Sequence, residues 1–268
     1  TYGYSGNVDT RRAAVTTIIY NGVSPYTLLP YARFENFPNP NLKWEKVATL
    51  NLGIDFKLKS DILTGSVEYY QKKGVDLFGT VPVDYTSVAA FTILKNVASM
   101  SASGVDISLS SINMNRTVKW YSDLNVNYYQ DKVTDYYLSS NDASSFLNGG
   151  AQIAGLKGKP VYSIFSYLWA GLDPATGDPR GYVKGAVSKD YTALTGSSVQ
   201  VTDLQYNGPA TPRMIATLGN TVSWKNVSLT FRLMGKFGHY FKKRSIDYTS
   251  LFANKIGNAD FSNRWQQP

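Results

Sequence analysis

Carboxylates are the side chains of this sequence best suited to chemistry, and two of them bracket a predicted turn. Asp173 and Asp178 begin and end the string DPATGD. A calcium site collects about six or more oxygen ligands, whereas this string offers two carboxylates. Proline presets φ and glycine accepts positive φ, as tight turns require. We therefore interpret the string as a turn and predict no metal site there.

The remaining candidate catalytic groups lack the partners that catalysis requires. Asp55, Glu68 and Asp123 could pair as glycosidase acids, but they fall at alternating polar positions, which indicates a hydrated wall. The chain has one histidine, His239, and no cysteine, so multi-histidine and Cys-based zinc sites are excluded. Nucleophile-elbow, P-loop and dinucleotide-binding motifs are absent. We expect neither enzyme activity nor a cofactor.

The composition indicates a folded chain rich in aromatic residues. Of the 268 residues, 14% are aromatic and 17% are charged. Disordered chains have few aromatic residues and high charge, so disorder is excluded. The net charge of +8 is modest, and the longest basic run is Lys242–Arg244. Because a nucleic-acid groove needs a concentrated basic stripe, we expect no nucleic-acid partner.

Apolar and polar residues alternate along several long segments. Every second residue from Ala48 to Leu58 is apolar, and long strands are also predicted at Lys119–Tyr137 and Val227–Phe241. A period of two sends successive side chains to opposite faces of a β-strand. The exception is Tyr248–Ile256, whose spacing fits two or three turns of helix. The sequence therefore predicts an all-β fold.

Short and long connections alternate between these predicted strands, so one edge of the sheet has tight turns and the other has long loops. The tight turns are Lys59–Asp61, Asn113–Arg116, Pro174–Gly177 and Lys225–Asn226. The long connections are about Asn7–Pro38, Gly79–Lys95, Ser139–Pro160, Gly185–Pro209 and Lys242 onward. We predict that all four short turns lie at the same edge.

Three features favour a membrane barrel over a soluble sandwich. The strands exceed the about 9–11 residues that cross hydrocarbon. Aromatic residues such as Trp44, Trp120 and Trp224 lie near strand ends, as in interfacial girdles. Short turns opposite long loops are typical of outer-membrane barrels. We predict an antiparallel transmembrane β-barrel in the bacterial outer membrane, while a β-sandwich adhesin or carbohydrate-binding protein and a passive porin stay as alternatives.

The barrel hypothesis assigns a role to each face. Lipid is predicted to meet Leu50, Leu52, Ile54, Phe56, Leu229, Phe231 and Leu233. The lumen is predicted to be lined by Asn51, Asp55, Glu68, Asp123, Asn125, Asn127 and Arg232. Tyrosines of the predicted loops suit either stacking on sugar rings or contact with peptides, and these candidates are Tyr20, Tyr26, Tyr31, Tyr191 and Tyr206.

Five strings in order give the chain a family resemblance. They are TYGYSGN (Thr1–Asn7), NPNLKWEK (Asn39–Lys46) with NLGIDF (Asn51–Phe56), GLDPATGDP (Gly171–Pro179), ATPR (Ala210–Arg213) and RWQQP (Arg264–Pro268). In these strings the chain resembles the SusC/RagA-type TonB-dependent outer-membrane transporters of Bacteroidetes. The resemblance implies a plugged barrel of 22 strands. Residues 1–268 would be one partial barrel domain of about nine strands.

The resemblance also implies partners. A SusD-like surface lipoprotein would cap the barrel, and TonB, acting through an N-terminal part, would drive import of an oligosaccharide or a peptide. Outer-membrane lipid would surround the barrel, and Lys242–Arg244 could contact lipopolysaccharide phosphates. The family's plug, N-terminal extension and last strands lie outside residues 1–268. We therefore expect that this segment alone does not form a closed, transport-competent barrel.

Overall fold

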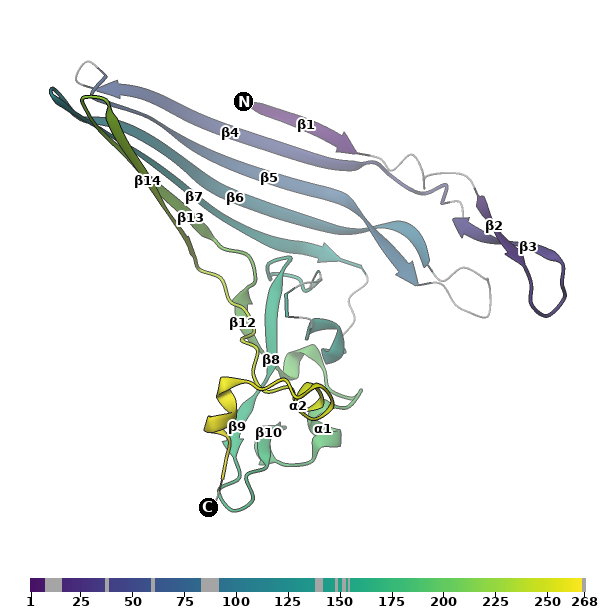
Figure 1. The fold of residues 1–268 in the computed structure, drawn as a ribbon. Helices are drawn as coiled ribbons and strands as arrows, with labels where there is room; N and C mark the ends of the chain where they lie inside the picture. The colour runs from purple at the N-terminus through teal and green to yellow at the C-terminus, as the bar shows by residue number, and fades with distance from the viewer. Residues whose placement is uncertain are drawn as a thin grey trace. The chain divides into compact units, whose positions relative to one another are not determined.

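The computed structural model describes residues 1–7, 16–36, 39–58, 61–82, 92–137, 142–147, 149–150, 153 and 155–266. They belong to two compact units. The first contains the long strands, and the second contains several short strands and helices (Figure 1). Unit 1 consists of Thr1–Ser139, Gly155–Val161 and Arg213–Phe237, and unit 2 of Ser140–Ala154, Tyr162–Pro212 and Gly238–Pro268.

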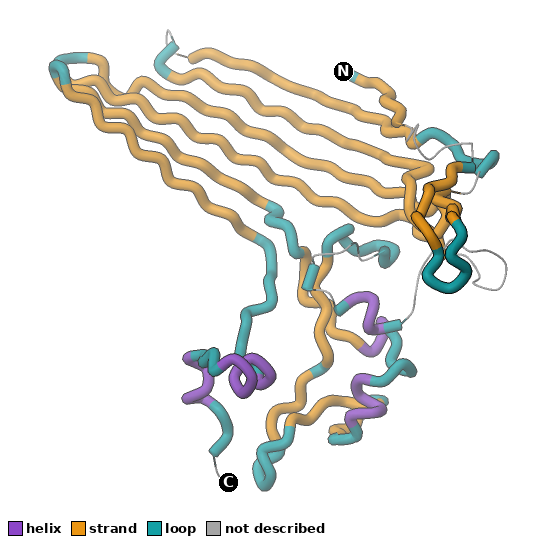
Figure 2. Tube along the Cα trace, turned by 45° about the vertical axis from the view of Figure 1, so that its right-hand side comes forward, coloured by secondary structure: helices purple, strands orange, loops and turns teal. Residues whose placement is uncertain are grey.

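Unit 1 is built on a seven-stranded antiparallel sheet in the order β1-β4-β5-β6-β7-β13-β14. Its strands run side by side, and all but β1 are 11 to 24 residues long (Figure 2). The strands are β1 (Tyr2–Asn7), β4 (Glu45–Leu58), β5 (Leu63–Pro82), β6 (Thr92–Asn115), β7 (Val118–Tyr136), β13 (Met214–Trp224) and β14 (Val227–Phe237). A separate hairpin pairs β2 (Thr17–Val23) with β3 (Pro30–Asn36). Within the described residues, β1 and β14 each pair on one side, so the sheet is open.

Three of the predicted short turns lie at one edge of this sheet. Leu58 pairs with Leu63, Asn115 with Lys119, and Trp224 with Val227. The register across the intervening strands brings these pairs to the same end. The alternation of short and long connections is therefore confirmed for the sheet. Two residues of the first predicted turn, 59 and 60, lie outside the described residues.

Two details of the sequence prediction were wrong. The turn Pro174–Gly177 is not at the edge of this sheet, because it joins two strands of unit 2. The strands around it have 3 to 5 residues, fewer than the about 9–11 needed to cross hydrocarbon. The last strand was predicted to reach Phe241 but ends at Phe237, because Gly238 has a φ of 72° and turns the chain out of the sheet.

Cross-strand register gives the sheet one polar and one apolar face. Residues directly opposite each other in an antiparallel pair share a face. One row across five strands contains Asp55, Ser66, Ser108, Asn125 and Thr217. The neighbouring row, which points to the opposite face, contains Ile54, Val67, Ile107, Val126 and Ala216.

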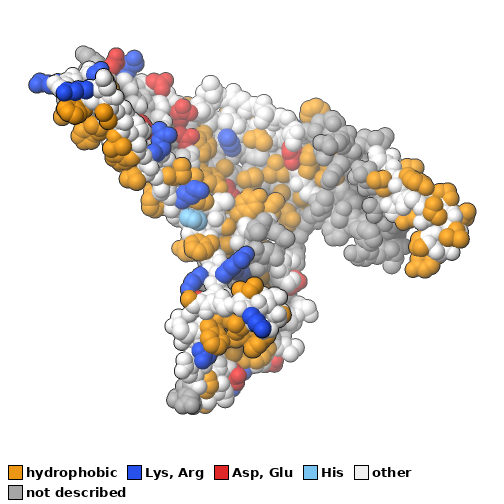
Figure 3. Space-filling model, viewed as in Figure 1, with side chains coloured by type: hydrophobic (Ala, Val, Ile, Leu, Met, Phe, Trp, Pro, Cys, Tyr) orange, Lys and Arg blue, Asp and Glu red, His pale blue; other side chains and the backbone are white. Residues whose placement is uncertain are grey.

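The apolar face is not buried against another layer in the part of unit 1 that the structure describes. Leu52 is 57% exposed, Ile54 71% and Leu233 62%. The buried apolar side chains of this part are Val97 and Val133. A sandwich would bury the apolar face against a second sheet, so the arrangement is that of a barrel wall. Figure 3 shows hydrophobic side chains along this sheet and basic ones at its short-turn end.

Unit 2 folds around a small aromatic core. Phe165, which is 2% exposed, contacts Phe146 and Tyr206 with 5.5 Å between ring centroids in each pair. Its two sheets have the orders β11-β10-β9 and β12-β8. The elements are η1 (Ala143–Phe146), β8 (Ser163–Tyr167), β9 (Trp169–Leu172), β10 (Pro179–Val183), β11 (Ala186–Ser188), α1 (Tyr191–Thr195), η2 (Val201–Asp203), β12 (Leu204–Pro209), α2 (Tyr248–Asn254) and η3 (Ala259–Asn263).

Helices are short throughout the described residues. The helix predicted from the spacing of Tyr248–Ile256 is confirmed as α2, which Asp247 caps by accepting a hydrogen bond from the Ser250 N–H at 3.2 Å. No described helix has the length and apolar character needed to span a membrane.

The assignment of the two faces makes a prediction about substitutions in a membrane-inserted barrel that contains this sheet. Leu52→Arg or Phe231→Arg should destabilise the folded barrel by about 2–4 kcal/mol near the bilayer midplane, because a guanidinium would enter hydrocarbon. The matched variant Asn51→Arg, on the opposite face, should be tolerated. The measurement is the free energy of folding into lipid bilayers. Equal losses on the two faces would contradict the assignment.

Candidate functional site

The seven residues predicted to line a lumen all lie on the polar face of the sheet. Asp55 and Asn125 lie in one cross-strand row, which runs through Ser66 and Ser108. Asp123 and Arg232 lie in another row, in which each is opposite Gly219. Asn51, Glu68 and Asn127 occupy the same face in neighbouring rows. That this face lines a lumen stays a prediction.

Side chains of this face form hydrogen bonds across the strands. Asn51 Nδ2 donates to Glu68 Oε2 at 3.4 Å, and Ser108 Oγ donates to Asn125 Oδ1 at 3.0 Å. Asn127 Nδ2 donates to Asp106 Oδ1. The Arg232 guanidinium lies 3.6 Å from Asp123, but its side chain is 63% exposed, and exposed ion pairs contribute little stability. The face is therefore a polar surface of hydrogen-bond donors and acceptors.

Two glycines of the polar face allow larger neighbours to lie close to the backbone. A Cβ at Gly104 would collide with the Tyr70 hydroxyl, and one at Gly219 would collide with the Asp123 carboxylate. The sheet also has a shallow hollow of about 310 Å³, lined by residues that include Asp106, Asn127 and Thr217. The hollow offers polar contacts to a passing molecule and has no catalytic pairing.

A polar cluster occurs on the apolar face near the short-turn edge. Asn220, 8% exposed, accepts hydrogen bonds through Oδ1 from Trp120 Nε1 at 2.9 Å and from Ser122 Oγ at 2.7 Å. Nearby, the Lys225 ammonium lies 4.7 Å from the Trp224 ring centroid. Such aromatic and polar groupings suit the interface between lipid and water. The tryptophans were predicted from their places near strand ends, whereas Asn220 was not, because it occupies an apolar position of the alternation.

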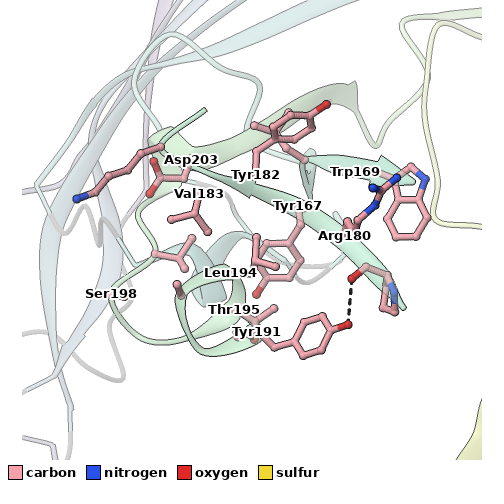
Figure 4. A pocket seen from close by; sticks show the side chains of 16 residues that line it. Tyr167, Trp169, Arg180, Tyr182, Val183, Tyr191, Leu194, Thr195, Ser198 and Asp203 are labelled. Carbon is pink, nitrogen blue, oxygen red and sulfur yellow. Dashed lines mark hydrogen bonds between the residues drawn. The ribbon is translucent and has the colours of Figure 1, made fainter. Parts of the chain in front are cut away.

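Unit 2 contains a larger pocket, of about 660 Å³, between its β-strands and α1. Figure 4 shows side chains from the end of β8, from β9, from β10 and from α1 converging on it. Gly181 lets α1 pack tightly on β10, because a Cβ there would lie 2.7 Å from the Leu194 side chain. Its lining includes the apolar and aromatic residues Tyr167, Leu168, Trp169, Tyr182 and Leu194 and the charged residues Arg180, Lys184 and Asp203.

The five candidate tyrosines do not meet at one site. Tyr20, Tyr26 and Tyr31 belong to the exposed β2–β3 hairpin of unit 1. Tyr191 lines the pocket of unit 2, but its hydroxyl donates to the Pro179 carbonyl at 3.0 Å. Tyr206 packs against Phe165 in the core of that unit.

Sequence reasoning missed the other aromatic residues of the pocket and Arg180. These residues lie on strands too short for a clear alternation. The string Gly171–Pro179 was a signal close to them, but it does not reveal which side chains face the pocket.

The DPATGD string forms a turn, as interpreted from its sequence. The Asp173 N–H donates to the Asp178 carbonyl at 2.8 Å. Lys189 joins both ends, with Nζ 2.9 Å from Asp173 and 3.3 Å from Asp178. The hydrogen bond from Lys189, with that from the Ala175 N–H, lowers the pKa of Asp173 to about 2. Within the described residues, no group of three or more potential ligands could hold a metal ion.

The same turn contacts the segment that follows η3. Gly177, with a φ of 75°, lies against the indole of Trp265, and a Cβ at this position would collide with that ring. A positive φ and an adjacent ring both require glycine here. The turn and residues near Trp265 therefore form one packed element of unit 2.

A sheet of long antiparallel strands, with a hydrated face and an uncovered apolar face, defines the wall of a membrane β-barrel. Residues 10–264 match the family described as TonB dependent receptor-like, beta-barrel. The chain therefore belongs to this family of receptors, and its relatives are of the SusC/RagA type.

Curated relatives extend over most of the chain. The TonB-dependent receptor P3 of Formosa agariphila is 25% identical over 86% of the chain, which corresponds to 24% of that receptor. The TonB-dependent receptor SusC of Bacteroides thetaiotaomicron is 26% identical over 81% of the chain and 22% of its own length. The chain thus spans about a quarter of the length of these relatives.

Solved structures show the same fold. The RagAB peptide transporter matches with a TM-score of 0.68 and 25% identity, over 87% of this chain and 25% of the matched chain. The RagAB peptide importer in its closed-closed state matches with a TM-score of 0.70 and 26% identity, over 89% of this chain and 26% of the matched chain.

The Lys189 bridge predicts how the turn responds to acid. Because the folded pKa of Asp173 is about 2, below its ordinary 3.8, the stabilisation is complete above about pH 4 and is lost as the pH falls through about 2. Lys189→Gln should weaken the turn at neutral pH and move the loss to higher pH. Hydrogen exchange at the Gly177 N–H, corrected for intrinsic rates, measures this. Lys184→Gln is the control, and an unchanged profile in Lys189→Gln would contradict the role of the bridge.

Proposed function

We propose that the protein containing this chain is a TonB-dependent importer of nutrients across the bacterial outer membrane, in which this chain forms barrel wall and exterior loops. The observation that carries the proposal is the division of the long-stranded sheet into a polar face and an uncovered apolar face. Family membership supports the same function. Lipid would meet the apolar face, and the polar face would keep the passage hydrated.

We propose that the long connections form the exterior surface. The β2–β3 hairpin is inserted between β1 and β4, and most of unit 2 is inserted between β7 and β13. Both insertions leave the sheet at the ends opposite the three short turns, which in outer-membrane barrels is the extracellular side. Exposed aromatic residues such as Tyr26, at 94%, and Trp169, at 63%, suit recognition of a nutrient there.

The proposed partners are TonB, acting through the N-terminal part of the whole receptor, and a SusD-like surface lipoprotein. The proposed cargo is an oligosaccharide or a peptide. The similarity to the RagAB peptide transporter supports the peptide alternative. The proposed process is gated passage, in which no covalent bond is made or broken, and the relatives are receptors, not enzymes.

We also propose that residues 1–268 belong to a single barrel domain whose closure needs further strands of the same polypeptide. Each backbone group left unpaired in hydrocarbon costs several kcal/mol. The outer edges of β1 and β14 have no partner among the described residues. Pairing of both edges with other strands of the receptor removes that cost.

Deletion of the gene in the native bacterium tests the import function. Uptake of labelled short peptides and of labelled oligosaccharides is measured in the parent and in the deletion strain, with and without a protonophore. We expect one class of cargo to require both the gene and the proton-motive force. A passive porin predicts uptake that survives the protonophore, and that result or unchanged uptake in the deletion strain would overturn the proposal.

A further inference from the structure

The pocket of unit 2 combines apolar walls with two cationic side chains, Arg180 and Lys184. Its volume of about 660 Å³ lies within the usual range for small-molecule sites. Tyr167, Trp169 and Tyr182 supply aromatic walls, and Leu168 and Leu194 supply aliphatic ones (Figure 4). Sites of this kind bind the apolar part of a ligand and use few polar groups to orient it.

Arg180 lines this pocket and lies at an irregularity in the pairing of β10 with β9. Pro179 pairs with Leu172 and Gly181 with Trp169, so the register shifts around Arg180. Such irregularities re-aim side chains and occur next to binding sites. Arg180 Nε is buried and has no hydrogen-bond partner within the described residues. A buried donor without an acceptor is costly, so a ligand that provides one would be favoured.

The other polar groups of the pocket are partly committed to the protein. The Tyr191 hydroxyl donates to the Pro179 carbonyl at 3.0 Å. Asp203 Oδ2 accepts a hydrogen bond from the Gln200 N–H at 2.9 Å. Each sugar ring brings several hydroxyl groups that need partners when buried. The exposed lining of the pocket is mainly apolar, and its cations are Arg180 and Lys184, so an apolar side chain with one anionic group matches it better than a ring of hydroxyl groups.

We propose that this pocket binds the C-terminal residue of a short peptide, with an apolar or aromatic side chain against Trp169 and Leu194 and the carboxylate on Arg180. The planar guanidinium can pair with a carboxylate through two parallel N–H···O bonds. The pocket thereby selects peptide cargo, and this inference rests on the proposed import function. Tight packing of α1 on β10 through Gly181 preorganises the walls.

The test measures binding to the purified whole receptor in detergent, without TonB. The probes are N-acetyl-alanyl-alanyl-phenylalanine as the free acid and as the C-terminal amide. The wild type should bind the acid at least roughly tenfold more tightly than the amide, as a charge-assisted hydrogen bond predicts. Arg180→Gln should remove that preference, Arg180→Lys should restore part of it, and Trp169→Ala should weaken both probes.

Arg116→Gln, an exposed arginine in the β6–β7 turn of unit 1, is the matched control and should leave both affinities unchanged. Equal binding of acid and amide by the wild type would overturn the proposal, and so would tighter binding of a neutral gluco-oligosaccharide. An Arg180→Gln receptor that keeps the preference for the acid would overturn it too. If Arg180→Gln does not fold, the wild-type preference and Trp169→Ala decide the question.

The two proposals fail in different ways. If uptake depends on neither the receptor gene nor the proton-motive force, while the pocket still prefers the acid to the amide, the import function alone is refuted. Energy-dependent uptake by a receptor whose pocket binds acid and amide equally refutes the pocket alone.

Discussion

Backbone pairing across the seven-stranded sheet is the constraint on which the other features of unit 1 depend. Hydrocarbon offers no water to unpaired N–H and C=O groups, so every strand inside it must be bonded on both sides. The pairing from β4 to β14 is nearly continuous. Because a one-residue slip would exchange the two faces, the same hydrogen bonds that satisfy the backbone also keep Ile54 and Asp55 on opposite sides.

Two residues break the alternation of polar and apolar side chains, and in each case a side chain on the adjacent strand makes the exception possible. Asn220 is a buried polar residue on the apolar face, and the Trp120 indole and the Ser122 hydroxyl satisfy its oxygen. On the polar face, Gly104 leaves room for the Tyr70 ring. In both cases the compensating group comes from an adjacent strand, so each departure depends on the register being correct.

The sequence was sufficient to predict the long strands, their two faces and the turns between them, because a period of two persists over 11 residues or more. It was insufficient for unit 2, whose strands have 3 to 6 residues. The turn at Pro174–Gly177 was recognisable from its residues, but its place in a separate unit was not. Arg180 was not identified either, because its setting depends on an irregular pairing of β9 with β10 that has no local sequence signal.

The contact between Gly177 and Trp265 connects segments that lie on either side of the β13–β14 hairpin in the sequence. The Tyr240 N–H adds a second tie by donating to the Pro209 carbonyl at 2.9 Å. The chain therefore connects both strands of that hairpin to unit 2: β13 through residues 209–213 and β14 through residues 238–240. A side chain gained at position 177 would therefore disturb more than its own turn: besides the strain of a positive φ, it would displace the Trp265 ring and loosen the contact that joins the segments before and after the hairpin.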